Sequence, residues 1–501
     1  MKHQIFRLAL IVVFCTSPMF ATHGTRMVGF NAQSAGRGGA SFGVYDSPSL
    51  MMTNPAGIAF LNSAAVDADF SLMVPTLHFT NTLNNQKGET NYFPIAALGY
   101  ANPQHDADWS WGIGMFTQGG MGADFSLNHA LFVDANGNHV PQEYHSKLAV
   151  MQGGPSFAYR LSPSLAIGAS AHLMYSMLDF KMPYSLSPSV MRGVANPITG
   201  MTFGAMFSAP ASSGGFGYNE VTALAAMNDL TAIGFGAKIG IAYKINDNIS
   251  LGLSYTSPTS FTYKNGSAKM DMTAQMNDAF GKAVQGFMMQ NPGATQGDAQ
   301  AAIMQQFGQM GIDMMAGVAA NYDLKAKLKF PQSIGIGTLV KASENVRLAL
   351  DVEWVNWKNA FDNMTLTLSN GTSTNINTML GNDGNLSIQF PMKWKDQVAV
   401  RFGGEYDVIP TLTLRAGFAY GSNPVPETTV FPVFPAIVES HMTFGAAYQL
   451  SNAFTINGAY EFALNKAETA SSQSLLAQEY NNSISELQEN IFHLSLAWVL
   501  Q

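Results

Sequence analysis

Length, composition and charge narrow the class of protein before any motif is considered. The chain has 501 residues, of which 12% are charged and 11% are aromatic, and it contains 47 glycines. The charged fraction is about half that of an ordinary soluble domain, and the net charge of −8 argues against a nucleic-acid-binding protein, which needs a basic face.

The N-terminus is typical of a secretory signal peptide, which we place at residues 1–21. Basic residues precede a short apolar run at 8–14, and Ala21 offers a small residue for cleavage. Cys15 leaves a lipoprotein anchor as an alternative. If cleavage follows Ala21, the mature chain has no cysteine, which excludes disulfides and cysteine–metal sites. No later stretch approaches about eighteen uninterrupted apolar residues, so we do not expect a helical membrane protein.

Residues 22–62 lack a strand pattern and are rich in small residues. The Gly-rich cluster at 36–40 is not a dinucleotide fingerprint, because no apolar strand precedes it and no βαβ unit follows. A turn that favours close backbone packing follows at Asn54, Pro55, Ala56 and Gly57. The segment is interpreted as a compact plug inside a larger structure or, alternatively, as a disordered leader.

From residue 63 onward the alternation of apolar and polar residues predicts about fourteen strands. We place them at 64–80, 92–103, 109–119, 147–161, 165–180, 229–245, 249–264, 323–342, 345–369, 386–407, 411–421, 440–450, 453–466 and 488–500. Tight turns alternate with long loops near 119–146, 181–228, 265–322, 422–439 and 467–487. Short turns at one rim and long loops at the other indicate an outer-membrane β-barrel, with the apolar side of each strand toward lipid.

The loop at 265–322 has a helical rather than an extended pattern. Apolar residues recur at steps of three and four before and after the break at 291–293. The helices could simply cover the barrel mouth, or they could form a flexible, Met-rich docking surface for hydrophobic ligands. For the second interpretation the candidate ligand-binding residues are Met276, Phe280, Val284, Phe287 and Met288.

Several charged side chains fall on the inward side of the predicted strands. They are Lys238, Arg347, Asp351, Glu353, Arg401, Glu405, Arg415 and Glu461. One interpretation is a ladder of ion pairs that anchors the plug through Arg26, Arg37 and Asp46. The other is that Lys238, Arg401 or Arg415 binds a ligand carboxylate.

Three parts of the chain resemble the FadL-type outer-membrane transporters of long-chain fatty acids and other hydrophobic compounds. The Gly/Ala-rich run that closes on residues 54–57 resembles the plug of that family, called the hatch. Residues 351–357 resemble its paired-Trp strand, and the block at 394–426 resembles its most recognisable segment.

The resemblance implies an all-β fold: a transmembrane antiparallel barrel of fourteen strands at 63–501, with the hatch at 22–62 in its lumen and partly helical extracellular loops. It also implies ligand capture in a groove of the outer loops, transfer to a lumen pocket, and hatch-gated lateral release at a kinked third strand. Here the residues that could supply the kink are Gly119, Gly120 and Gly122, which could equally begin an ordinary loop.

We therefore expect a non-enzymatic, passive transporter of hydrophobic molecules in the Gram-negative outer membrane, with long-chain fatty acids as the favoured cargo. Alternatives are an aromatic-hydrocarbon channel, a general diffusion porin or a surface adhesin on the same barrel. A barrel hydrolase built around His441 lacks a nucleophile motif. No cofactor, metal or nucleic acid is expected. Expected partners are the ligand, outer-membrane lipid, lipopolysaccharide and the barrel assembly machinery, and we expect a monomer.

Overall fold

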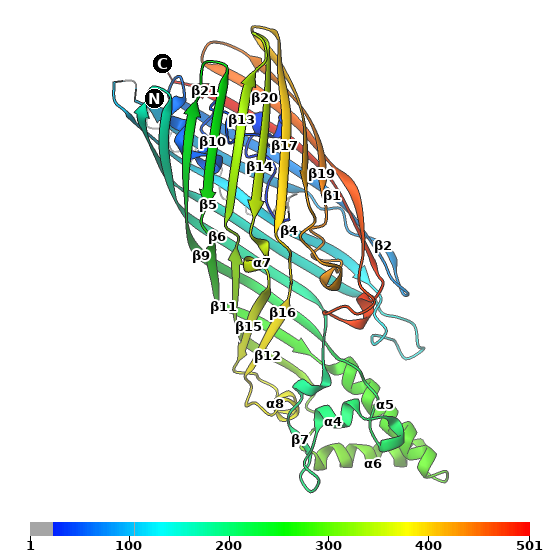
Figure 1. The fold of residues 1–501 in the computed structure, drawn as a ribbon. Coiled ribbons are helices and arrows are strands. Elements are labelled where there is room, and N and C mark those ends of the chain that lie inside the picture. The colour runs from blue at the N-terminus through cyan, green and yellow to red at the C-terminus, as the bar shows by residue number, and fades with distance from the viewer. Residues whose placement is uncertain (1–23, 105, 501) are drawn as a thin grey trace, which may run out of the picture.

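The fold is one closed antiparallel β-barrel (Figure 1). The computed structural model describes residues 24–104 and 106–500, so the signal peptide predicted at 1–21 lies outside the described residues. The sheet has nineteen strand segments. Four barrel strands are each split into two segments and β2 is a short addition, which leaves the fourteen strands that the sequence predicts. The barrel closes where β1 pairs with β21, from Ala65 opposite Val499 to Thr80 opposite Ile484.

Ten barrel strands are continuous. They are β1 (Ala65–Thr80), β3 (Phe93–Pro103), β4 (Trp109–Leu127), β5 (Gln142–Ser162), β6 (Leu165–Leu186), β9 (Val221–Lys244), β18 (Leu412–Gly421), β19 (Ser440–Gln449), β20 (Phe454–Thr469) and β21 (Ile484–Val499). The split strands are β10 (Ile249–Thr256) with β11 (Thr259–Asp271), β12 (Ala319–Phe330) with β13 (Ser333–Lys341), β14 (Val346–Val355) with β15 (Asn363–Ser369), and β16 (Leu386–Pro391) with β17 (Gln397–Ile409).

The four splits correct the prediction that 249–264, 323–342, 345–369 and 386–407 are continuous strands. Pro258 and Pro331 stand at the first two splits, where a residue without an N–H cannot donate to the ladder. The third split contains the short helix α7 (Trp357–Ala360), and the fourth spans residues 392–396. The four split strands therefore form a lower segment, toward the termini, which Figure 1 draws at the top, and an upper segment, toward the long loops.

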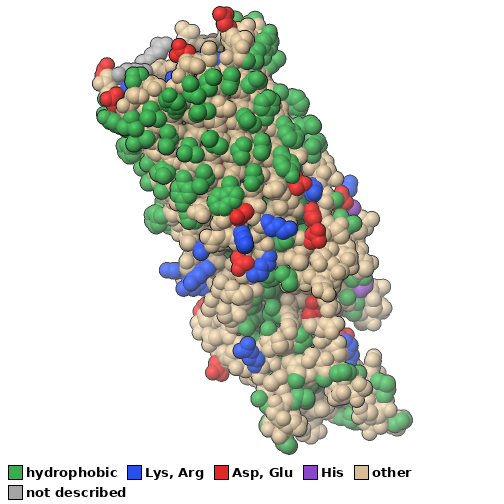
Figure 2. All heavy atoms as spheres, viewed as in Figure 1, with side chains coloured by type: hydrophobic (Ala, Val, Ile, Leu, Met, Phe, Trp, Pro, Cys, Tyr) green, Lys and Arg blue, Asp and Glu red, His purple; other side chains and the backbone are tan. Residues whose placement is uncertain are grey.

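The alternation of side chains matches a barrel with a lipid face. Ile336, Leu350 and Val352 are exposed on the outside, whereas Asp351 and Glu353 are buried inside. Figure 2 shows a continuous hydrophobic band around the visible face, at the end of the barrel where the termini lie. Long loops extend from the opposite end, which is the extracellular side in barrels of this kind.

The helices lie in the N-terminal segment and in the long loops. The N-terminal ones are α2 (Ala32–Gly36), α3 (Leu50–Thr53) and η2 (Pro55–Phe60). The loops contain η3 (Pro188–Val190), α4 (Phe203–Ser208), η4 (Ala211–Ser213), α5 (Thr273–Gln290), α6 (Gln296–Gln309), α8 (Thr374–Leu380), η5 (Glu427–Thr429) and η6 (Gln478–Tyr480), besides the short strands β2 (Asn85–Lys87), β7 (Val194–Asn196) and β8 (Met201–Thr202). No helix among the described residues is long and apolar enough to cross a bilayer.

Two segments fill the barrel interior. Residues 24–62, called the hatch below, are almost entirely buried and contact strands on both sides of the lumen: α2 packs on β19 and β20, and η2 on β5, β6 and β9. The second segment belongs to the long loop predicted at 422–439, which connects β18 to β19 with the predicted bounds. Within it, residues 429–438, called the inward loop below, are buried without a gap. This burial, which was not predicted, places apolar chain in the lumen between the hatch and the outer loops.

Candidate functional site

The tip of the hatch (residues 24–27) is held in the lumen by a buried ion-pair cluster. The Nη1 atom of Arg26 donates to Oε1 of Glu353 at 2.8 Å, and Nη2 of Arg401 donates to Oε2 of the same carboxylate at 2.8 Å. All three side chains are buried. Two guanidinium groups on one carboxylate give a paired, hydrogen-bonded cluster, and loss of either partner would leave an uncompensated buried charge.

A second cluster anchors the middle of the hatch. Arg37 donates to Asp46 at 2.6 Å and to Glu405 at 2.7 Å, so it bridges the hatch to the barrel wall. Glu405 also accepts from Arg415 at 2.6 Å and from Arg347 at 2.7 Å. Arg401 and Arg415 were candidates either for ion pairs or for binding a ligand carboxylate. Because their guanidinium groups are already paired with glutamates, the ion-pair interpretation describes them.

Lys238 differs from the other basic residues of the lumen. The lysine and arginine residues that are buried as a whole in the described part of the chain are Arg26, Arg37, Lys238 and Arg401, and only Lys238 lacks a carboxylate within 4.0 Å. Its Nζ donates to the hydroxyl of Thr256 at 2.7 Å. An ammonium group can donate three hydrogen bonds, so Lys238 retains capacity to bind an anionic group.

The predicted hatch motif at 54–57 forms the start of η2. Asn54 is fully buried; its Oδ1 accepts from the N–H of Ala56 at 3.2 Å. Its Nδ2 donates to the carbonyl oxygens of Phe42 at 3.0 Å and of Ile241, in the wall, at 2.9 Å. The motif thus fixes the end of the hatch to β9, and a glycine in the wall makes room for it. A Cβ atom at Gly240 would lie 2.1 Å from Asn54 Oδ1.

The predicted kink residues lie where the hatch tip meets β4. The register of β4 against β5 shifts between Thr117 and Gly119, which is a β-bulge. The N–H of Gly120 donates to the Thr25 carbonyl at 3.0 Å, and that of Met27 donates to the Gln118 carbonyl at 3.5 Å. Gly119 is required for this approach, because an added Cβ would lie 1.8 Å from the Thr25 oxygen.

Beyond the bulge, β4 leaves its neighbour β3. The β3–β4 ladder extends only from Pro103 opposite Ser110 to Leu98 opposite Met115. Residues 116–123 are all buried, including Gly122, so this part of β4 turns into the interior rather than alternating between lipid and lumen. The pairing between β3 and β4 is thus interrupted between residues 93–97 and residues 116–123. We call this interruption the lateral window. The sequence signal for it was the run of glycines.

The lumen above the hatch is apolar and aromatic. Trp357, Phe361 and Trp394 pack with ring centroids 4.7 to 5.1 Å apart. The hatch tip contacts this cluster, because a Cβ at Gly24 would lie 2.8 Å from the Trp357 ring. Higher in the lumen is a pocket of about 40 Å³, which we call the lumen pocket. It is lined by the apolar side chains of Phe180, Tyr184, Met227, Met270, Leu324, Leu366, Leu368, Ile388 and Phe390, among others.

The five ligand-binding residues predicted on the helical loop do not lie together on an open surface. Met276 and Val284 are buried, Phe280 and Phe287 are half-buried, and Met288 is 37% exposed. Helix α5 packs against α6, with Phe280 next to Phe307. The apolar periodicity thus indicated contacts within the loop structure rather than an exposed stripe.

The first turns of α5 instead face a groove of about 790 Å³, which we call the outer groove. Its other walls are the loop at 129–142 and the residues that begin β9. Apolar Leu131, Val133 and Val140 line it together with polar Asp278 and Lys282. Sequence reasoning missed this groove, because it is assembled from three separate loops with no shared motif.

A largely buried acid lies beside this groove, in the extracellular loop at 470–483. Tyr144 donates to Oε2 of Glu479 at 2.8 Å, and Nε2 of His129 lies 3.9 Å from the same oxygen. Burial raises the pKa of Glu479 to about 8. Burial, aided by the nearby His139, lowers the pKa of His129 to about 4. Near pH 7 both groups are therefore neutral, which suits an apolar setting.

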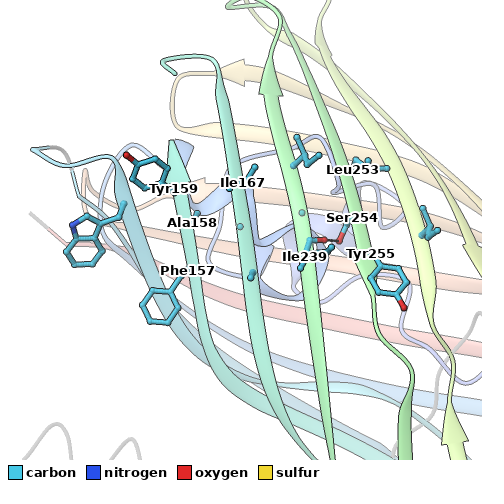
Figure 3. A pocket seen from close by; sticks show the side chains of 14 residues that line it. Phe157, Ala158, Tyr159, Ile167, Ile239, Leu253, Ser254 and Tyr255 are labelled. Carbon is cyan, nitrogen blue, oxygen red and sulfur yellow. Dashed lines mark hydrogen bonds between the residues drawn. The ribbon is translucent and has the colours of Figure 1, made fainter. Parts of the chain in front are cut away.

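An apolar recess of about 750 Å³ lies on the outside of the wall rather than in the lumen. Figure 3 shows the rings of Phe157, Tyr159 and Tyr255 projecting away from the barrel, with the hatch on the other side of the strands. Ala169 lies between Phe157 and Ile239 in the outward register, and its small side chain leaves the depression. The recess lies in the hydrophobic band and is open to the hydrocarbon chains of the bilayer, so we assign it no part in cargo binding.

Comparisons with known proteins agree with this architecture. The solved structures of the toluene transporter TodX of Pseudomonas putida and of a FadL homologue of Pseudomonas aeruginosa are similar, with TM-scores of 0.66 and 0.67 and identities of 18% and 15%. Each alignment covers 95% of this chain and 100% of the other. The toluene transporter TbuX of Ralstonia pickettii has a TM-score of 0.62 at 16% identity, covering 94% and 99%.

A curated outer membrane protein of Neisseria meningitidis serogroup B is 26% identical over 192 residues, which is 38% of this chain and about a third (34%) of that relative's length. Residues 14–495 match the sequence profile of the family described as outer membrane protein transport protein (OMPP1/FadL/TodX). With its fourteen-stranded barrel, the chain belongs to this family of outer-membrane transport proteins.

Proposed function

We propose that the protein takes up long-chain fatty acids passively across the outer membrane. Cargo binds first in the outer groove, passes to the lumen pocket, and leaves through the lateral window when the hatch tip moves. The observation that carries the choice of cargo is Lys238, a buried lysine without a carboxylate partner, below an apolar and aromatic lumen. A fatty acid supplies both the missing carboxylate and the apolar tail.

The hatch tip is the proposed gate because it connects three parts of the path. Arg26 joins it to the charged cluster beside Lys238, Gly24 contacts Trp357, and Thr25 is hydrogen-bonded to β4 at the window. A ligand carboxylate at Lys238 would also lie near Arg26 and Arg401, whose charges influence Lys238. It would compete with Glu353 for these cations and so weaken the attachment of the tip.

The lumen pocket must enlarge to hold an acyl chain, since its present volume is about 40 Å³. Met227 and Met270 line it, and the flexible methionine side chain allows such repacking. Burial of the tail stabilises the complex by roughly 0.8 kcal/mol per methylene, so a long chain can bind without many polar contacts. The mechanism therefore needs one polar contact and a deformable apolar lining.

The Lys238→Met variant tests the cargo, because methionine keeps the length of the side chain and removes its charge. We expect affinity for oleate to fall about 10- to 100-fold, the usual effect of losing a charge-assisted hydrogen bond. Affinity for the uncharged methyl ester should stay unchanged, as measured by binding to purified protein in detergent. Equal losses for the acid and the ester would refute the role of Lys238.

A neutral aromatic hydrocarbon is the second candidate cargo. Two of the similar structures are named toluene transporters, and here Trp357, Phe361 and Trp394 line the lumen. If the cargo is a neutral aromatic hydrocarbon, toluene should bind equally well to the wild type and to Lys238→Met, and it should compete with oleate. A diffusion porin is less well supported, because the hatch and the inward loop fill the interior, and no feature of the outer loops favours an adhesin.

A further inference from the structure

The outward face of the wall changes character at the strand splits. In the lower segment, Ile334 and Ile336 of β13 are 46% and 54% exposed. In the upper segment, the three exposed positions of β12 nearest the split are Lys325, Lys327 and Lys329, and Asp323, Asn321 and Ala319 follow farther out. The neighbours of the three lysines on β11 and β15 in the same register are Ser260, Thr262, Thr365 and Thr367. The splits therefore mark the extracellular edge of the hydrocarbon band, where lipid headgroups lie.

Lysines gather at this edge without carboxylate partners. We call Lys325, Lys327, Lys329, Lys358 and Lys395 the lysine patch; all five are exposed, and none has a carboxylate within 4.0 Å among the described residues. Elsewhere on the extracellular half, several lysines are paired, as in Lys466 with Glu439 at 2.9 Å and Lys282 with Asp278 at 2.9 Å. Figure 2 shows basic side chains, with some acidic ones among them, on the loop side of the hydrophobic band, over α7 and the ends of the split strands.

The lysine patch surrounds a hollow of about 790 Å³. Lys327, Lys329 and Lys358 line it, together with the amide and hydroxyl side chains of Ser260, Thr262, Asn356, Asn359, Asn363, Thr365 and Gln389. One carboxylate, that of Asp362, also lines the hollow, a second, that of Asp396, lies nearby, and both already have partners. Asp362 pairs with Lys393 at 2.9 Å, and Asp396 accepts from the backbone N–H of Lys358 at 3.0 Å. The hollow thus offers several donors and an excess of positive charge.

We propose that this hollow binds the phosphorylated headgroup of an outer-leaflet glycolipid. Its phosphates would lie among Lys327, Lys329 and Lys358, and its sugar hydroxyls would meet the amide and hydroxyl side chains. Its acyl chains would continue along the exposed Ile334 and Ile336 just below the splits. A soluble anion would not use this apolar face, and a zwitterionic lipid would not use the surplus charge. Basic clusters at a membrane edge favour anionic headgroups in this way.

The Lys327→Gln/Lys329→Gln variant of the full mature protein tests this site. Its matched control is Lys87→Gln/Lys341→Gln, which removes two exposed, unpaired lysines outside the patch. Both are purified in detergent, exposed to diphosphorylated lipid A, and examined by native mass spectrometry. At about fivefold per lysine, we expect the patch variant to bind lipid A about 30-fold more weakly and the control to match the wild type.

Two further probes separate headgroup binding from other causes. Dephosphorylated lipid A should bind the wild type as weakly as diphosphorylated lipid A binds the patch variant, and inorganic phosphate alone should not compete at equal concentration. Thermal unfolding of both variants should match the wild type, since these side chains lie on the surface. Equal lipid A binding by the wild type and the patch variant would overturn the proposal, and so would equal loss in both variants.

Discussion

Replacing Gly119 by alanine should release the hatch tip from β4. The new Cβ would lie 1.8 Å from the Thr25 oxygen, so the tip must retreat by roughly 2 Å to reach ordinary contact near 3.5 Å. That movement breaks the hydrogen bonds from Gly120 to Thr25 and from Met27 to Gln118. At about 0.5–1.5 kcal/mol each, the attachment weakens by about 1–3 kcal/mol, so the detached fraction rises roughly 5- to 150-fold.

The assay is the labelling rate of a cysteine placed at Thr25, which is fully buried in the closed state. A soluble maleimide should react faster in Gly119→Ala by the same 5- to 150-fold. The matched control is Gly458→Ala, also on a barrel strand, where the nearest atom to an added Cβ is 3.9 Å away. Equal labelling rates in Gly119→Ala and Gly458→Ala would show that β4 does not hold the tip, and the gating mechanism would fail.

The other predictions concern the extracellular loops. Because the pKa of Glu479 is about 8 when folded, against an ordinary value of 4.5, the folded loop holds more protons between these values and loses stability as pH rises through that window. Glu479→Gln should remove this trend, seen as pH-independent proteolysis of residues 470–483 between pH 5 and 9; a slope that persists would assign it to another group. Met276→Ser, at a buried site, should destabilise the α5 region by about 2–4 kcal/mol and speed its proteolysis. Met288→Ser, at an exposed site, should do neither, and equal effects of the two substitutions would contradict the packing of Met276 in the loop interior.

The wall could be predicted from sequence because its signal is local. Alternation along 346–355 and 397–409 shows which side of each strand faces lipid, and the lengths of turns and loops give the orientation. The splits were missed because the apolar pattern continues across them. Pro258 and Pro331 were the available signals, since proline is rarely tolerated inside a paired strand.

The site was less accessible because its contacts join distant residues. Arg26 and Glu353 are 327 positions apart. Ion pairs between the hatch and the wall could therefore be predicted from sequence, but the partner of each charge could not. The burial of residues 429–438 depends on the space that the hatch leaves, which no local pattern encodes. Inward glycines such as Gly119 and Gly240 were a usable signal, because each lies where the hatch backbone or side chain touches the wall.

Photocrosslinking of a fatty acid in transit tests the proposed route most directly. A long-chain fatty acid with a diazirine in its tail is added outside intact cells, illuminated during uptake, and its attachment sites are mapped by mass spectrometry. We predict adducts in the outer groove, around the lumen pocket, and on residues 116–123 of β4 at the lateral window. Adducts along η2, at the periplasmic end between hatch and wall, with none at the window, would contradict lateral release.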